Sequence, residues 1–249
     1  MVMALMTKSY STPTFRPLYE QIKILITQSL VAGEWAPGDV IPSEQELASR
    51  FKVSQGTVRK AIDELAAENI LVRRQGKGTF VATHAEEYAQ YHFLRIVEFT
   101  GKKEIPVSEL LSCQRGKADN EVAEHLDLAR GAPVIELRRL LRFSDEPVIL
   151  DEIYLSAVLF KGLDETVINE YSGTLYSLYE TRFTTRIIRA EERLRAVAAN
   201  PTVDGLLGVS AGAPLLSIER IAYTYGDKPV EWRVSRCDTS KHCYLNEIG

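Results

Sequence analysis

Ser43-Glu-Gln-Glu-Leu-Ala-Ser-Arg-Phe-Lys-Val-Ser-Gln-Gly-Thr-Val-Arg-Lys-Ala-Ile62 contains the start signals of two short helices. Ser43 and Glu46 form a capping-box pattern, in which each side chain satisfies a backbone donor at a helix start. Ser54 can cap a second helix after the turn at Lys52-Val53. The stretch therefore predicts a pair of helices separated by a tight turn.

The second of these helices has one apolar stripe and one polar surface. Val58, Ile62 and Leu65 recur at helical spacing and should face a core. The side chains left at its start and on its outer surface are polar or basic: Gln55, Thr57, Arg59 and Lys60. A helix of this kind can enter a DNA major groove, where such groups meet base edges and phosphates.

A basic hairpin follows the helix pair. Residues 71–75 and 79–81 read as strands around Gly76-Lys77-Gly78, where the glycines permit the backbone geometry of a tight turn. Lys77 stands at the tip, and Arg73 and Arg74 flank it. We expect a wing beside the helix pair.

The charge distribution separates two interpretations of this segment. Clusters of Lys and Arg are usually a solvated face with no partner. Between Arg50 and Val81, however, seven Lys or Arg stand against three acids, a net charge of +4, whereas the whole chain carries −4. A basic patch on an acidic chain can attract one polyanion without coating the whole protein in nucleic acid. We therefore expect the segment to bind double-stranded DNA.

Four motifs in the first third of the chain give this segment a specific resemblance. They are Pro17-Leu-Tyr-Glu-Gln-Ile22, Gly38-Asp-x-Ile-Pro-Ser-Glu-x-Glu-Leu-Ala48, Phe51-x-Val-Ser-x-x-Thr-Val-Arg-x-Ala-Ile62 and Gly76-x-Gly-Thr-Phe-Val81. Together they resemble the winged helix-turn-helix domain of the GntR family of bacterial transcription regulators. The resemblance implies DNA contacts from the helix pair and the wing, at Gln45, Ser54, Gln55, Thr57, Arg59, Gly76 and Lys77.

The residue pattern adds Lys60 and Arg73 to these expected DNA contacts. Gln55 departs from the family, because many relatives have Arg at this position. Arg reads guanine with two hydrogen bonds, whereas Gln suits adenine. The operator sequence is therefore expected to differ from those of better-known members.

The composition excludes several other classes of protein. A chain of 249 residues with 45% hydrophobic and 26% charged residues is typical of a globular protein of one large or two modest domains. No stretch approaches the roughly 20 apolar residues of a membrane span, and Val2–Met6 is too short for a secretory signal. Cys113, Cys237 and Cys243 lack metal-site spacing. We expect a cytoplasmic protein with reduced thiols, no metal and no cofactor.

Four segments are expected along the chain. Residues 1–14 read as a flexible tail, and residues 15–82 as the DNA-binding domain. Polar residues 83–92 form a linker, and residues 93–249 form a domain for effector binding and dimerisation. The first helix of the DNA-binding domain should bury one apolar face, made of Leu18, Ile22, Leu25, Ile26 and Leu30.

The C-terminal portion carries an internal repeat. Val122-x-x-x-Leu126-x-Leu128-x-x-Gly131-Ala-Pro-Val134 recurs as Val203-x-x-x-Leu207-x-Val209-x-x-Gly212-Ala-Pro-Leu215. A short helix and a hairpin, given twice, predict a pseudo-symmetric antiparallel sheet with helices on one side. Residues 174–179 begin a further helix, and residues 184–198 read as a strand. The fold class is therefore α+β.

Two arginines interrupt the apolar alternation of these strands. Arg139 shares a face with Leu137 and Leu141, and Arg220 occupies the same place in the second copy. A charge directed into an apolar face needs a partner, because leaving it unpaired costs several kcal/mol. The partners can be internal acids (Arg139 with Asp151 or Glu152, Arg220 with Glu231) or a ligand, and the sequence leaves both open.

This second domain resembles the UTRA effector domain of the HutC subfamily, which shares its fold with chorismate lyase. The resemblance rests on Gly-x-Pro-Val, Arg139-Leu, Pro147-x-x-x-acid151, Thr174-Leu-Tyr176, Ile188-x-Ala-x-Glu192 and Pro229-Val-Glu231. It implies a small polar or anionic metabolite, such as a sugar phosphate, organic acid or amino-acid-like compound. The matching effector contacts are Arg139, Asp151, Thr174, Tyr176 and Glu231. Leu141 and Cys237 depart from the family, where a second arginine and an aromatic hydroxyl are common.

The leading hypothesis is a homodimeric repressor that an effector releases from operator DNA. An enzyme related to chorismate lyase is the alternative, although no catalytic triad, metal cluster or phosphate loop is evident and fold alone confers no activity. A third possibility is a DNA-binding architectural protein whose second domain only dimerises. We expect no catalytic residues.

Overall fold

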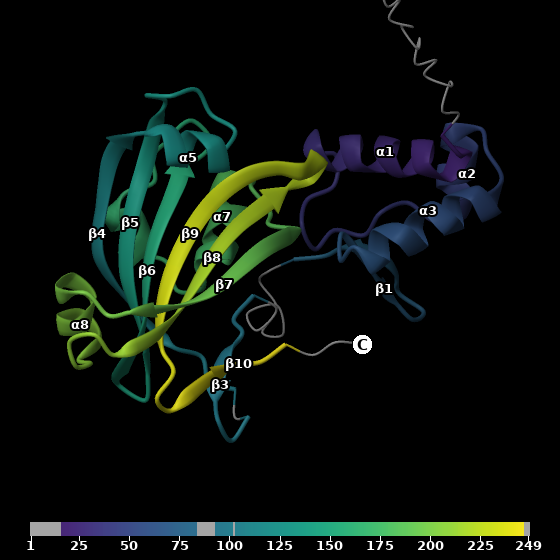
Figure 1. Cartoon of the computed structure of the whole chain (residues 1–249). Helices are drawn as coiled ribbons and strands as arrows, with labels where there is room; N and C mark the ends of the chain where they lie inside the picture. The colour runs from purple at the N-terminus through teal and green to yellow at the C-terminus, as the bar shows by residue number, and fades with distance from the viewer. Residues whose placement is uncertain (1–15, 84–92, 102, 247–249) are drawn as a thin grey trace, which may run out of the picture.

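Three helices and a hairpin build the N-terminal domain (Figure 1). They are α1 (Leu18–Val31), α2 (Glu44–Phe51), α3 (Gln55–Ala67), β1 (Leu71–Arg74) and β2 (Gly78–Val81). The computed structural model describes residues 16–83, 93–101 and 103–246. The expected tail (residues 1–14) and all but the first residue of the expected linker (residues 83–92) lie outside the described residues.

The predicted capping signals are confirmed. Ser43 Oγ accepts from the backbone N–H of Glu46 over 3.3 Å, and Glu46 Oε2 accepts from the backbone N–H of Ser43 over 2.8 Å. Lys52 ends α2 in the left-handed region, with a φ of 55°. Ser54 then caps α3 by accepting from the N–H of Thr57. These contacts satisfy backbone donors that a helix start otherwise leaves unpaired.

One apolar core holds the three helices and the wing together. Ile22, Ile26 and Leu30 of α1 pack against buried residues of α2, α3 and the hairpin, among them Leu47, Val58, Ile62, Leu65 and Val81. The apolar face predicted for α1 is too wide, because Leu18 is 59% exposed and Leu25 is 41% exposed. The remaining core face positions α3 and the wing on the same surface.

The second domain is a six-stranded antiparallel sheet of strand order β4-β5-β6-β9-β8-β7. Its first half comprises β4 (Val107–Lys117), α5 (Asn120–His125), β5 (Pro133–Phe143) and β6 (Glu146–Ser156). Its second half comprises β7 (Arg189–Ala198), α8 (Pro201–Leu207), β8 (Pro214–Thr224), η1 (Tyr225–Asp227) and β9 (Lys228–Asp238). The two halves join through the central pair β6–β9. The internal repeat thus becomes a pseudo-symmetric sheet, and the α+β class is confirmed.

Helices cover both faces of this sheet, whereas the sequence predicted one. α5 and α8 pack on one face, against Trp232 and Leu150 respectively. α6 (Glu165–Asn169) and α7 (Leu175–Phe183) pack on the other face, with Ile135 and Ile153. Consecutive strand residues point to opposite faces, so the apolar runs of β5 and β6 supply both cores.

The predicted strand over residues 184–198 is too long at its start. Thr184 has a φ of 52° and closes α7, and β7 begins only at Arg189. A small sheet of β3 (Ile96–Glu98) and β10 (His242–Tyr244) lies below the large sheet (Figure 1). None of the helices in the described ranges is long and apolar enough to cross a membrane.

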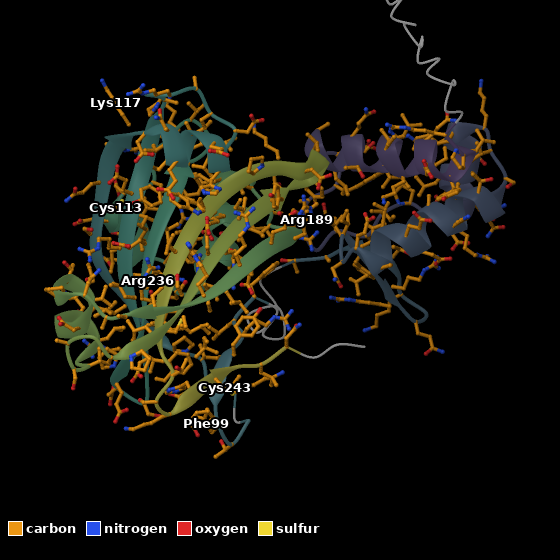
Figure 2. All side chains as sticks on the ribbon, viewed as in Figure 1. Phe99, Cys113, Lys117, Arg189, Arg236 and Cys243 are labelled. Atoms are coloured by element: carbon orange, nitrogen blue, oxygen red, sulfur yellow. The ribbon has the colours of Figure 1, made fainter. Side chains whose placement is uncertain are left out.

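The two domains touch at the tip of the β8–β9 hairpin and at the entry to β7 (Figure 1). Tyr225 and Ile188 pack against the core of the N-terminal domain. Arg189, labelled in Figure 2, lies at this junction and lines a cleft of about 1070 Å³ between the domains. The tip of the β8–β9 hairpin therefore contacts α1, which packs against α3.

Candidate DNA-binding surface and effector pocket

A groove between the start of α2 and the wing gathers most of the predicted DNA contacts. Its volume is about 920 Å³, and it is lined by Gln45, Gln55, Arg73, Gly76 and Lys77 among others. Gly76 has a φ of 71°, and Gly78 has a φ of 113°. Glycine alone adopts such backbone angles at little cost, so the turn that raises Lys77 above the groove depends on both residues.

The remaining predicted contacts lie on α3. Arg59 is exposed, whereas Ser54 Oγ and Thr57 Oγ1 lie 2.8 Å apart and share a hydrogen bond at the start of the helix. The Nζ of Lys60 sits 3.8 Å from the centroid of the Tyr19 ring. Lys60 therefore lies on the α1 side of α3 rather than beside the wing.

Glu44 is the anionic centre of this surface, and the sequence argument missed it. Its carboxylate accepts from Arg59 Nε over 2.9 Å, from Arg73 Nη1 over 3.0 Å and from Gln55 Nε2 over 3.3 Å. The hydrogen bond from Arg59 lowers the pKa of Glu44, with help from Arg73 and Gln55. Glu44 thus holds three predicted DNA contacts in one arrangement before DNA arrives.

A cavity of about 430 Å³ opens on the α7 side of the large sheet. The strands β5, β6, β8 and β9 form its floor, and the first residues of α7 and of β3 form its walls. Four of the five predicted effector contacts line it: Arg139, Asp151, Thr174 and Tyr176. Thr174 also caps α7 by accepting from the N–H of Ser177, so the pocket wall and the helix start share one residue.

Asp151 anchors the polar side of the cavity. It is 1% exposed, and its Oδ2 lies 2.9 Å from Arg139 Nη2 and 3.4 Å from Arg233 Nη1. Ser235 Oγ donates to its Oδ1 over 2.6 Å. Burial alone would raise the pKa of Asp151, but Arg233 and Arg139 outweigh it and hold that pKa below its ordinary value. Asp151 is therefore an ionised carboxylate with its partners in place.

Glu231, the fifth predicted contact, lies behind the cavity wall with no exposed surface. It accepts from Tyr176 OH over 2.9 Å and from Tyr179 OH over 3.0 Å, and it pairs with Arg233 over 2.9 Å. Burial raises the pKa of Tyr176 to about 12, so its hydroxyl stays protonated. Glu231 thereby fixes the position of α7 against β9.

The internal pairings differ in part from those predicted. Arg139 pairs with Asp151, which is one of the two internal partners predicted for it. Arg220 pairs with Glu192 and not with Glu231, and it donates to the backbone carbonyl of Phe93. Glu231 pairs instead with Arg233, because both side chains lie on the same face of β9, two residues apart.

Sequence reasoning missed Arg233 and Ser235 as pocket residues. Both line the cavity, and both contact Asp151. The signal was available, because period-two alternation from Glu231 places both on the inward face of β9. No group of His, Cys, Asp and Glu that could hold a metal ion occurs within residues 16–83, 93–101 and 103–246.

Two family comparisons match this architecture. Residues 18–81 match the gntR family of bacterial regulatory proteins, and residues 102–242 match the UTRA domain. The chain belongs to the GntR family. Its UTRA domain places it with the HutC-like members, as the sequence motifs predicted.

Individual relatives support the same assignment for this GntR-family protein. The HTH-type transcriptional regulator YurK of Bacillus subtilis strain 168 is 32% identical over 217 residues, 86% of this chain and 88% of the relative. The "Probable fructoselysine utilization operon transcriptional repressor" of Escherichia coli K12 is 30% identical over 213 residues, 86% of this chain and 87% of the relative.

A solved structure extends the likeness to the effector domain. The ligand-binding domain of a GntR-family transcriptional regulator from Bordetella bronchiseptica has a TM-score of 0.61 and 38% identity, and the match covers 64% of this chain and 99% of that one. The GntR-family protein described here is a DNA-binding transcription regulator whose UTRA domain binds a controlling effector.

Proposed function

We propose that this regulator is a cytoplasmic homodimeric repressor, and that a metabolite in the 430 Å³ cavity releases it from operator DNA. The observation that carries the proposal is the position of α7. This helix lines the cavity at its first turn, and at its last turn Glu180 contacts Thr83 and pairs with Arg186, which binds the backbone of the DNA-binding domain. The relatives described as repressors support the direction of control.

The DNA-binding surface is α3 together with the wing. Gln55, Thr57 and Arg59 would meet base edges in the major groove, and Lys77 would reach the adjacent backbone or minor groove. Ser54 and Gly76 set the local geometry, while Gln45, Arg73 and Lys60 would contact phosphates. One such surface supplies few contacts, so two subunits should bind half-sites about one helical turn apart.

The effector would contact Arg139, Thr174 and Tyr176 directly. Asp151 orients Arg139, and Glu231 orients Tyr176 from behind the wall. We propose no catalytic role for these acids. Asp151 and Glu231 are each held by arginine, so neither carboxylate is poised as a general acid or base.

A buried ion pair would carry the signal between domains. Arg186 and Glu180 lie 3.5 Å apart, with side chains 5% and 3% exposed. Arg186 donates to the backbone carbonyls of Asn69 and Ile70, and Glu180 accepts from Thr83 Oγ1. A ligand that shifts the first turn of α7 would move Glu180, and with it the turn that follows α3. Such coupling is typically worth 1–3 kcal/mol.

The test begins with an operator selected from a pool of random duplexes by the full-length protein. Arg59→Ala should abolish preference for the selected sequence in gel-shift assays while the protein stays dimeric in sedimentation. Lys161→Ala, which removes an exposed cation from the effector domain, is the matched control. Unchanged preference in Arg59→Ala would show that α3 is not the recognition helix.

The same operator tests control by the effector. A deproteinised extract of metabolites from the source cells should release wild-type protein from the duplex. An extract that leaves operator affinity unchanged at every growth condition tried would argue for a constitutive DNA-binding protein instead.

A further inference from the structure

The charges that surround the effector cavity cancel. Three buried arginines stand beside it, and each is paired with a carboxylate, in the pairs Arg139–Asp151, Arg233–Glu231 and Arg220–Glu192. Arg139, Arg220 and Arg233 are 9%, 8% and 7% exposed, so water solvates their charges poorly and each needs a carboxylate partner. The network is neutral before any ligand enters.

The part of the cavity lining beside these ion pairs is apolar. Its residues belong to a single buried cluster that is separate from the core beneath α7, and the cavity faces Ile96, Leu141, Ile149, Ile218 and Cys237. Burial raises the pKa of the Cys237 thiol, so this side chain stays neutral. Within the described part of the chain, no charged residue belongs to this cluster.

One further cation lines the cavity. Arg95, which is half-buried, lines both the effector cavity and the cleft between the domains. Its guanidinium forms no ion pair with any residue in the described part of the chain. The cavity therefore offers one uncommitted positive charge, at the end where the cleft opens.

We propose that the effector is an amphipathic monoanion, with one carboxylate-like group at Arg95 and Arg139 and an apolar body against Leu141, Ile149 and Ile218. This inference rests on the proposed function. A phosphate monoester would bring about two negative charges into a neutral network with one spare cation. Leaving a buried charge uncompensated is strongly unfavourable, whereas an apolar body gains free energy in proportion to the surface that it buries.

Four probes separate charge from apolar character. They are octanoate, 1-octanol, octyl phosphate and glucose 6-phosphate, each added to the full-length protein without DNA at about pH 8, where a phosphate monoester carries close to two charges. The cavity volume lies within the range that small ligands occupy. Calorimetry should give a dissociation constant for octanoate at least tenfold lower than for octyl phosphate and glucose 6-phosphate. 1-Octanol should bind more weakly than octanoate.

Two variants assign the binding to these residues. Leu141→Arg adds a cation to the apolar part of the lining. It should make octyl phosphate bind more tightly than octanoate. Leu141→Met, which adds no charge, is the control. Arg95→Gln removes the unpaired charge from a half-buried position and should weaken octanoate binding about tenfold. The affinities for octanoate and 1-octanol should then become more similar. Arg95→Gln keeps the test decisive where Leu141→Arg does not fold.

Three outcomes overturn the ligand class. They are tighter binding of glucose 6-phosphate than of octanoate, equal binding of octanoate by wild type and Arg95→Gln, and no binding of octanoate at millimolar concentration. None of them touches the proposed function, which fails separately if metabolite extract does not change operator affinity.

Discussion

Arg186 Nη2 donates a hydrogen bond to the backbone carbonyl of Asn69 over 2.7 Å, which fastens a buried side chain of the effector domain to the turn after α3. Glu180 holds the same guanidinium from the last turns of α7. One helix and one ion pair thus connect the cavity to the turn that follows α3.

Removal of this ion pair should uncouple the two domains. The double variant Glu180→Gln/Arg186→Gln avoids leaving one buried charge alone, which would cost about 3–5 kcal/mol. We expect it to bind operator DNA, with a much smaller change in affinity when metabolite extract is added. Arg182→Gln is the control, because Arg182 lies exposed on the same helix. Fluorescence anisotropy with and without extract measures the operator affinity and its change. If extract weakens operator binding by the double variant as much as by wild type, the ion pair does not transmit the signal.

Gln55 should set the base preference of one operator position. Its amide is exposed at the start of α3, and its Nε2 donates a 3.3 Å hydrogen bond to Glu44. Gln pairs with adenine and Arg with guanine, and a good pair discriminates by about 1–3 kcal/mol. Operators selected by Gln55→Arg should replace adenine by guanine at one position in each half-site. Identical selected sequences would show that Gln55 does not read a base.

Glu44 should raise the specificity for operator DNA by weakening the electrostatic attraction of the surface to DNA of any sequence. Glu44→Gln removes the carboxylate partner of Arg59 and one of the two carboxylate partners of Arg73, and it removes one negative charge from this surface. We expect tighter binding to random duplex and a lower ratio of specific to nonspecific affinity. Glu170→Gln makes the same charge change at an exposed site on the effector domain. A ratio that rises in Glu44→Gln, or that falls equally in both variants, would contradict this role.

Asp151 should contribute to stability in a manner that depends on pH. Its pKa is held down in the folded protein, so its contribution is fully present above the ordinary aspartate pKa of about 3.9 and is lost as pH falls through the folded value. Asp151→Asn leaves Arg139 and Arg233 short of a partner, and we expect a loss of about 3–5 kcal/mol at pH 7.

Urea unfolding at pH 7 and at lower pH checks this expectation, with Asp127→Asn as the control. Asp127 is exposed in a loop, so its variant should stay within about 0.5 kcal/mol of wild type. The difference between Asp151→Asn and wild type should shrink as the pH is lowered. A constant difference would mean that the side chain contributes by shape rather than by charge.

The sequence was most informative where structure is local. The capping box at Ser43, the cap at Ser54 and the glycine turn at Gly76 depend on neighbours within a few residues, and all three are confirmed. The repeat in the second domain was also predictable, because the sequence pattern of a short helix and a hairpin occurs twice.

Pairings across the sheet and between domains were not readable in the same way. Alternation shows that Arg220 faces inward, but the partner depends on register, and register brings Glu192 of β7 opposite Arg220. The contacts of Glu44 with Arg73 and of Arg186 with Asn69 join residues far apart in the chain. No periodicity encodes such contacts, because they exist only after the helices, strands and domains have packed together.

Occupancy of the effector cavity should change the affinity for operator DNA. The most direct measurement compares the release of operator DNA by metabolite extract from wild type and from Ile218→Trp, each relative to its own affinity without extract. Trp at this position would project a larger apolar side chain into the 430 Å³ cavity while the charged residues of its ion pairs are all retained. We predict that extract weakens operator binding by wild type and not by Ile218→Trp. Equal release from both proteins would contradict the account.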